Sequence, residues 1–186
     1  MDFNIYNKAV QDHYLQVWNN AFSSHQLLKG PYDELPPGFK VLKFPPTPSR
    51  SMWTYATVGF SQPQEEHPIE IHVFAPQEQD SLIELLTVIA HYHHTEAKLN
   101  LGDTVNLGVP WWPQSTCEYG LISLPYLDGP SLEWLQHSAY QTRFLWLIPV
   151  TKKEVDYKKK FGLQSLEEKF DENAFNYLDP YRGSMV

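Results

Sequence analysis

Residues 144–150 constrain the fold more than any other segment, because the run FLWLIPV contains only apolar residues. A strand with one exposed face alternates apolar and polar residues, whereas a continuous apolar run is typical of a strand that is buried on both faces. The run is also far shorter than the roughly 20 apolar residues that a membrane-spanning helix needs. We therefore predict a central strand in a sheet that is covered on both sides.

Other segments supply the remaining strands and helices of this predicted domain. Alternation and β-favouring residues predict strands at 41–44, 52–60, 69–75 and 118–126. Apolar residues at spacings of three and four predict helices at 5–22 and 82–98. The segment 29–50 is rich in Pro and Gly, so we expect an extended connector there. A turn is expected at 128–130, followed by a short segment at 132–135.

Helix starts can be placed where Ser or Thr precedes Glu by three residues, a pattern in which the two side chains satisfy free backbone amides. The pattern occurs at Ser81, Thr151 and Ser165. Gly162 separates the last two helices as a helix terminator. Because helices flank a run of strands, the predicted fold class is α+β, with a mixed β-sheet covered by helices.

Length and composition favour a single domain over residues 1–186, because 42% of the residues are hydrophobic and 15% are aromatic. A lone cysteine, Cys117, indicates a reducing compartment, and the N-terminal residues lack the pattern of a secretion signal. We therefore expect a cytoplasmic protein that is not inserted in a membrane. The net charge of −8 opposes nonspecific binding to nucleic acid and suits a basic protein partner. Five lysines within 152–160 are interpreted as a solvated helix face.

The sequence contains no convincing catalytic motif. His91 and His94 are three residues apart on a predicted helix, but no H-E-x-x-H motif or paired-cysteine spacing accompanies them. Cys117 lies beside Glu118, whose carboxylate would raise the thiol pKa, so a structural role is favoured over a nucleophilic one. We predict no enzyme activity, no cofactor and no metal. A metal-dependent hydrolase that uses His91 and His94 remains an alternative.

The tetrad at 110–113, Pro-Trp-Trp-Pro, is the strongest candidate for a partner contact, because two adjacent indoles cannot easily bury on one strand face. Trp is enriched at binding hot spots, so Trp111 or Trp112 is expected either to fill a partner pocket or to anchor the core. Tyr126 and Asp128, beside the following turn, are weighed in the same way. In the same hypothesis Asp103, Glu118 or Asp128 pairs with basic residues of the partner, and the sequence does not select among the three.

The C-terminal strand and helices resemble the Suppressor of fused family. The resemblance rests on LIPVTKKEVDY at 147–157, on Phe-Gly-Leu at 161–163, and on Leu166 with Phe170. It also rests on WTYATVGFS at 53–61 and on the strand at 69–75 that precedes a long helix. The similarity covers residues 30–178, which form the predicted family core after an N-terminal helical segment at 1–29. These residues determine the fold and are not a catalytic motif.

The resemblance implies that the chain binds another protein. Chains of this length resemble the bacterial branch of the family, whose members are regarded chiefly as immunity proteins that neutralise toxins of polymorphic toxin systems. It implies a cytoplasmic antitoxin whose partner is a cognate toxin domain, and the acidic balance would complement a basic toxin. The same resemblance also allows an alternative function, a regulator that binds a transcription factor as animal relatives do.

Overall fold

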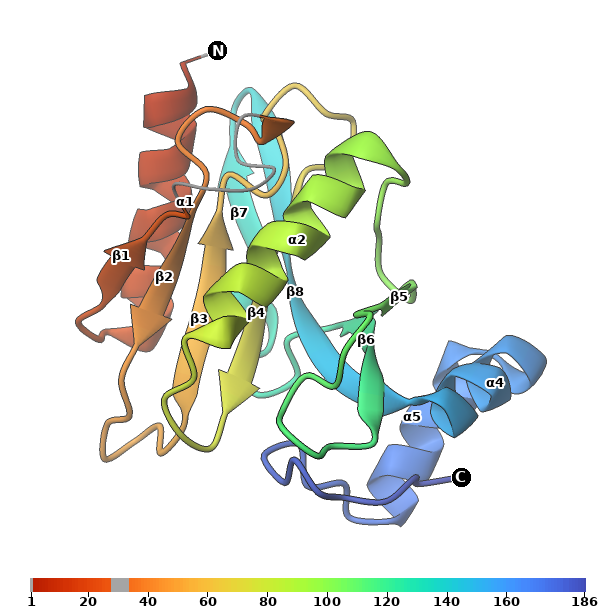
Figure 1. The fold of residues 1–186 in the computed structure, drawn as a ribbon. Helices are drawn as coiled ribbons and strands as arrows, with labels where there is room; N and C mark the ends of the chain where they lie inside the picture. Colours follow the sequence, from red (N-terminus) through yellow and green to blue (C-terminus); the bar gives the residue numbers. More distant parts are fainter. Residues whose placement is uncertain (1, 28–33) are drawn as a thin grey trace.

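The computed structural model describes residues 2–27 and 34–186, and its centre is the long strand β8 (Tyr140–Thr151). β8 pairs in parallel with β4 (Ile69–Ala75) along one edge. Along its other edge it pairs antiparallel with β7 (Trp134–His137) and then with β6 (Cys117–Ser123). The central strand at 144–150 is thus confirmed. The sheet is mixed and helices cover it, as the α+β prediction required (Figure 1).

The described residues form an eight-stranded sheet in the order β1-β2-β3-β4-β8-β6-β5, with β7 beside β8. The strands not yet given are β1 (Ser23–His25), β2 (Lys40–Phe44), β3 (Trp53–Val58) and β5 (Thr104–Asn106). The helices are α1 (Phe3–Trp18), α2 (Ser81–Thr95), α3 (Pro130–Glu133), α4 (Lys152–Phe161) and α5 (Leu163–Glu172). No helix within the described residues is long and apolar enough to cross a membrane.

Successive residues of β8 pack into different hydrophobic clusters on the two faces of the sheet, which explains the continuous apolar run. Leu145 and Leu147 belong to the cluster that α2 covers. Phe144 points to the opposite face and packs in the cluster of α1. Trp146 and Ile148 share that second face but pack with α4 and α5. Because strand side chains alternate between faces, covering both faces requires apolar residues at every position.

Two helical layers therefore share one face of the sheet, while α2 crosses the other face (Figure 1). α1 covers the end formed by β2, β3 and the start of β8. α4, α5 and the C-terminal segment cover the end formed by β6 and the second half of β8. The loop that follows β6 contacts both layers, since Asp128 accepts a hydrogen bond from Trp18 of α1 and Leu127 approaches α5.

The cap predicted at Thr151 is confirmed, and it fixes the direction in which the chain leaves the sheet. The Thr151 hydroxyl accepts from the Glu154 amide, and Glu154 Oε2 accepts from the Thr151 amide at 2.7 Å. Arg182 of the C-terminal segment completes this buried node, because its guanidinium donates to both carboxylate oxygens of Glu154, at 2.6 and 3.0 Å. Gly162 ends α4 with a positive φ of 91°, a conformation that favours glycine.

Two other predicted caps are wrong. α2 begins after Asp80, so Ser81 is already its first helical residue, and no side-chain hydrogen bond caps the helix; the Asp80 carboxylate accepts from the Lys43 ammonium at 2.8 Å. α5 begins directly after Gly162, so Ser165 lies inside its first turn. The Ser-x-x-Glu pattern is present in both helices, but each helix begins at or before its Ser. The Ser side chain therefore does not act as the cap.

Several predicted boundaries also differ from the structure. The helix predicted at 5–22 is α1, which ends when Asn19 adopts the left-handed conformation. The helix predicted at 82–98 ends at Thr95, and the strand predicted at 118–126 ends at Ser123, before Pro125. β1, β5 and β7 were not predicted, because strands of three or four residues leave too short a pattern. Residues 29–33 of the predicted connector lie outside the described residues.

A candidate protein-binding groove

A groove of about 590 Å³ opens on the sheet face that α1 and α5 share. It lies between the loop after β6, the middle of β8, and the outer face of α5 with the segment that follows it. Its lining residues are Tyr126, Leu127, Trp146, Ile148, Gln164, Glu167, Glu168, Phe170, Asp171, Ala174, Phe175 and Tyr177. The volume is within the range of ordinary ligand and side-chain pockets.

The floor of the groove is aromatic and apolar. Trp146 meets Tyr177 edge to face, with ring centroids 5.2 Å apart. Phe170 stacks on Phe175 at 4.5 Å. Trp146 is 4% exposed, and its indole Nε1 has no hydrogen-bond partner among the described residues. Phe175 and Tyr177 are only partly buried, so they provide the aromatic surface that an apolar side chain would remove from water on binding.

One wall of the groove is acidic. Glu167, Glu168 and Asp171 lie on the groove side of α5, because residues three and four apart in a helix share a face. Glu167 Oε1 accepts a hydrogen bond from the Ser123 hydroxyl at 2.7 Å, which holds this side chain against the sheet. Within the described chain, none of the lining residues is Lys, Arg or His. The wall therefore presents uncompensated negative charge beside an apolar floor.

The opposite rim carries two exposed apolar side chains, Tyr126 and Leu127, which are 54% and 46% exposed. Their loop is anchored by Asp128, whose carboxylate accepts from both terminal nitrogens of Arg50, at 2.7 and 3.0 Å. The Asp128 side chain is only 6% exposed, so its ion pair with Arg50 is buried. Arg50 in turn lies over the Trp18 ring at 4.8 Å. These contacts hold the loop that carries the exposed side chains of Tyr126 and Leu127.

The pKa of Tyr126 reports how closely the rim approaches the acidic wall. Burial and the negative charge of Glu167 raise the pKa of Tyr126 to about 12, against an ordinary value of 10.0. A phenol beside a carboxylate stays protonated, because ionisation would place two negative charges side by side. Tyr126 is therefore a neutral hydrogen-bonding group at physiological pH.

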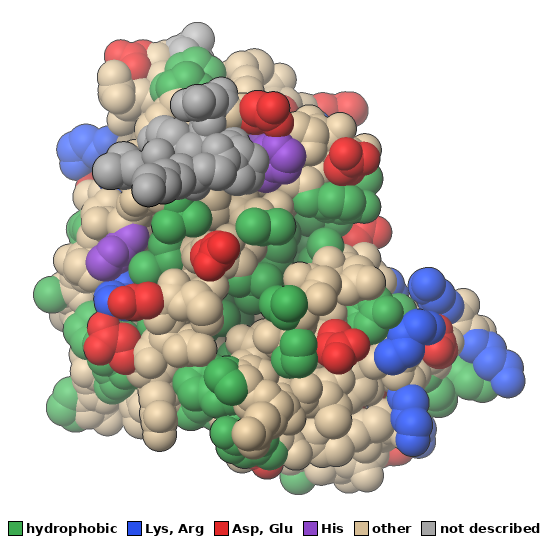
Figure 2. Space-filling model, viewed as in Figure 1, with side chains coloured by type: hydrophobic (Ala, Val, Ile, Leu, Met, Phe, Trp, Pro, Cys, Tyr) green, Lys and Arg blue, Asp and Glu red, His purple; other side chains and the backbone are tan. Residues whose placement is uncertain are grey.

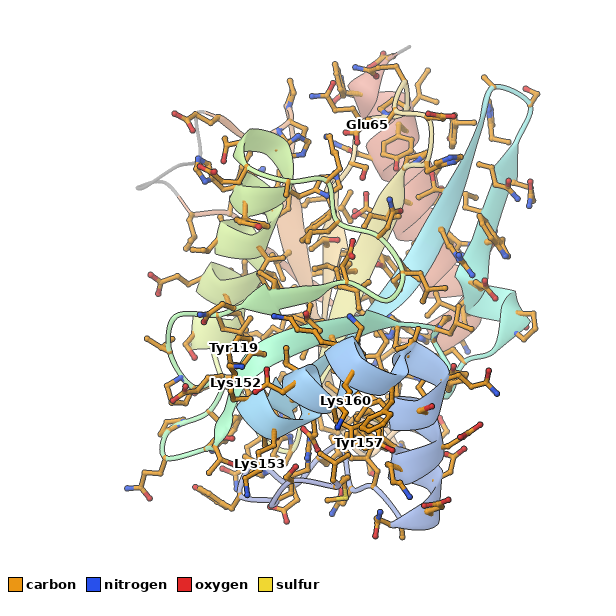
Figure 3. All side chains as sticks on the ribbon, turned by 90° about the vertical axis from the view of Figure 1, so that its right-hand side faces the viewer. Glu65, Tyr119, Lys152, Lys153, Tyr157 and Lys160 are labelled. Carbon is orange, nitrogen blue, oxygen red and sulfur yellow. The ribbon has the colours of Figure 1, made fainter. Side chains whose placement is uncertain are left out.

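The neighbouring helix α4 carries the lysine cluster on its outer side. Lys152, Lys153 and Lys160 lie on the helix face turned away from the sheet (Figure 3). Figure 2 shows the basic side chains gathered at the projecting end of the molecule. Lys152 pairs with Asp156 within the same helix, and both are more than half exposed. The exposure of Lys152, Lys153 and Lys160 fits the expected solvated helix face.

The predicted partner-contact residues divide between two parts of the molecule. Tyr126 lines the groove, and Asp128 supports its rim from a buried position. Trp111 is 4% exposed and lies in the core under α2, with Trp112 packed against it at 5.6 Å. Of the two roles weighed for Trp111, the structure gives it the core role. Glu118 is exposed on β6 and does not line the groove.

Asp103, the remaining candidate, also lies outside the groove. It precedes β5, and its carboxylate accepts from the Asn100 amide at 2.8 Å, which closes a local turn. Sequence reasoning missed most of the groove, including Trp146, Phe175 and Tyr177. A usable signal was present in α5, where Gln164, Glu167, Glu168 and Asp171 recur at helical spacing opposite Leu166 and Phe170.

The histidines near the end of α2 each bind a different part of the protein. His91 contacts Glu34, and His94 Nε2 lies 2.7 Å from the Phe60 carbonyl oxygen. His93 Nδ1 accepts from the Leu99 amide at 2.9 Å. Among residues 2–27 and 34–186, no group of three or more His, Cys, Asp or Glu side chains is arranged to hold a metal ion. Cys117 is buried, and burial raises its thiol pKa.

Comparison with known proteins places this architecture in a family. The profile of the Suppressor of fused protein (SUFU) family matches residues 36–183. The chain belongs to the SUFU family. A similar crystal structure is described as a SUFU homologue from Neisseria gonorrhoeae, with a TM-score of 0.86 and 33% identity over 98% of both chains. The resemblance inferred from the strand and helices at 147–170 is thereby confirmed.

Two more distant SUFU structures share the fold at 17% identity. The Sufu–Fu complex gives a TM-score of 0.66, covering 97% of this chain and 92% of the other. Drosophila Suppressor of Fused gives a TM-score of 0.70, and this chain matches 51% of its length. Comparison with curated proteins gave no match.

Proposed function

We propose that this SUFU-family chain is a cytoplasmic immunity protein that binds a cognate toxin one to one and blocks it by occlusion. The observation that carries the proposal is the groove, in which exposed Tyr126 and Leu127 face an aromatic floor across an acidic helix. Its apolar residues lie on β8, on α5 with the segment that follows it, and on the loop that Asp128 anchors to Arg50. Binding therefore costs little ordering of the protein.

The groove suits a macromolecular partner better than a small substrate. Its polar lining consists of the carboxylates and amide of α5 on one side and the Tyr126 phenol on the other, and it includes no Ser, Thr, Cys, Lys or His side chain within the described residues. Aromatic residues at the centre of a partly buried patch are typical of protein hot spots. The fold is also that of the Sufu–Fu complex, which is an assembly of two proteins. This similarity supports protein binding as the general activity.

Occlusion needs no chemistry from the immunity protein, since stoichiometric binding over a toxin surface prevents its substrate from approaching. Interfaces of this kind bury about 800 Å² on each partner. The groove with the exposed Tyr126 and Leu127 would form the centre of such an interface, and the surrounding polar residues of α5 would form its rim.

The proposal is tested by co-expressing the chain with the product of the adjacent gene in a host that this product kills. The expected result is restored growth and a one-to-one complex in light scattering after size-exclusion chromatography. A matched control is the chain with Arg182→Ala, which breaks the buried pair with Glu154 and should lose protection through misfolding. An adjacent product that is neither bound nor neutralised by the wild-type chain would overturn the proposal.

A further inference from the structure

We infer that the groove binds a cationic segment of the partner with one apolar anchor residue, flanked by Lys or Arg. The inference rests on the proposed protein-binding function and specifies the chemistry of the segment that the groove accepts. The anchor would sit on the floor formed by Trp146, Phe170 and Tyr177, and the flanking cations would face Glu167, Glu168 and Asp171.

The acidic wall lacks cationic partners of its own. Within the described chain, no Lys or Arg lies within 4.0 Å of the carboxylates of Glu167, Glu168 or Asp171. Lys169, their neighbour in α5, pairs instead with Glu172, which does not line the groove. Unpaired like charges on one helix face repel each other. An incoming cation relieves this repulsion and is attracted to the carboxylates.

The apolar floor makes this attraction selective. Exposed ion pairs contribute only about 0–1 kcal/mol each, so charge alone would not distinguish one basic segment from another. An anchor on the floor removes aromatic surface from water and brings its neighbours against the wall. Lys and Arg stems also pack well on aromatic faces while their charged ends remain polar. The recognised feature is therefore the combination of anchor and flanking cations.

The chain itself contains a segment of related chemistry, Lys159-Lys160-Phe161 at the end of α4. In the structure the Phe161 ring packs against Tyr157 at 4.6 Å and Lys160 lies 4.9 Å above it, while 51% of the residue stays exposed. The same residues are part of a regular helix that ends at Gly162. The geometry therefore points to a partner segment, and docking by α4 of a second copy is the competing outcome.

The test is an NMR titration of the ¹⁵N-labelled chain, which reads each tryptophan indole N–H separately. The probe is the blocked peptide Gly-Lys-Arg-Phe-Lys-Arg-Gly. One matched peptide replaces Phe with Ser, and the other replaces every Lys and Arg with Glu. The expected result is a saturable shift of the Trp146 indole signal with the first peptide, while the Trp112 signal, from the opposite core, stays fixed. Both matched peptides should bind at least about tenfold more weakly.

Two variants separate the groove from the lysine face. Glu168→Lys with Asp171→Lys should abolish the Trp146 shift, whereas Lys159→Glu with Lys160→Glu should leave it unchanged. Equal binding of the basic and acidic peptides, or a shift that survives reversal of the wall, would overturn the inference. So would concentration-dependent self-association that Lys159→Glu with Lys160→Glu removes. If the wild-type chain rescues growth but the basic peptide does not shift the Trp146 indole signal, this inference is rejected and the immunity proposal stands.

Discussion

The two helices that follow β8 are neighbours in the chain, yet their exposed faces differ in charge and in shape. α4 presents lysines on a convex face, and one of them is neutralised by Asp156 within the helix. α5 presents Glu167, Glu168 and Asp171 beside a groove with an aromatic floor. A charged face becomes a recognition site when an apolar surface next to it can exclude water, because surface charges in open solvent contribute little.

The comparison also explains why net charge alone is a poor guide to the partner. The value of −8 summarises the whole chain, including a helix whose lysines oppose it. The local arrangement on α5 gives the same expectation of a basic partner, and it does so by placing particular carboxylates around a particular hollow. The acidic groove and the lysine face should therefore respond differently to the same kind of substitution.

The largest effect is expected from the buried node that holds both helices on the sheet. Arg182 and Glu154 are 5% and 0% exposed, and Arg182 also donates to the Pro149 carbonyl at 2.8 Å. Arg182→Ala leaves the Glu154 carboxylate buried without its cation. We expect the free energy of unfolding to fall by about 3–5 kcal/mol, measured by urea denaturation.

The matched control is Lys152→Ala, which breaks the exposed pair with Asp156 on the lysine face. We expect this change to alter the free energy of unfolding by less than about 0.5 kcal/mol. Equal stability losses for Arg182→Ala and Lys152→Ala would show that the C-terminal segment does not hold the helices in place.

The second prediction exchanges the charges of the two faces. Glu168→Lys with Asp171→Lys should weaken affinity for the cognate partner at least about tenfold, or about 1.4 kcal/mol, because repulsion replaces attraction in the groove. Lys159→Glu with Lys160→Glu should change affinity by less than about twofold. Calorimetry at two salt concentrations measures both. A larger loss for the lysine variant would reverse the assignment of the two faces.

The smallest effect concerns the proton of Tyr126. Burial and Glu167 hold the pKa of Tyr126 at about 12, so Glu167→Gln should lower it toward 10. Because the folded-state pKa is raised, Tyr126 stabilises the fold below pH 10, and this contribution is lost as the pH rises from 10 to about 12. NMR titration of the tyrosine rings measures the shift. Glu168→Gln is the control. An unchanged pKa of Tyr126 in Glu167→Gln would contradict the contact between Tyr126 on the rim and Glu167 on the acidic wall.

The sequence predicted the scaffold well where the pattern was long or the local chemistry was specific. The apolar run in β8 and the cap joining Thr151 to Glu154 need only neighbouring residues to be recognised. The cap at Ser81 was wrong, because α2 starts one residue earlier than the pattern requires, with Asp80 at the cap position and Ser81 as the first helical residue. Local patterns thus predicted that a helix is present better than they predicted its first residue.

Most of the groove residues could not be predicted from local sequence patterns. Its lining joins Tyr126, Trp146 and Tyr177, which the sheet and the C-terminal segment bring together from three separate stretches of chain. Tyr126 was predicted from its place beside a turn. Trp111, an equally plausible aromatic in sequence, is buried under α2. Exposure is a property of the assembled fold, so adjacent aromatic residues do not reveal which of them remains available for binding.

Hydrogen–deuterium exchange of the chain with and without its cognate partner tests the central claim most directly. We predict that the partner slows amide exchange in residues 126–128 and 164–177, which surround the groove, and leaves residues 152–161 of α4 unchanged. Protection confined to α4, with no change around the groove, would contradict the account and would make the lysine face the binding surface.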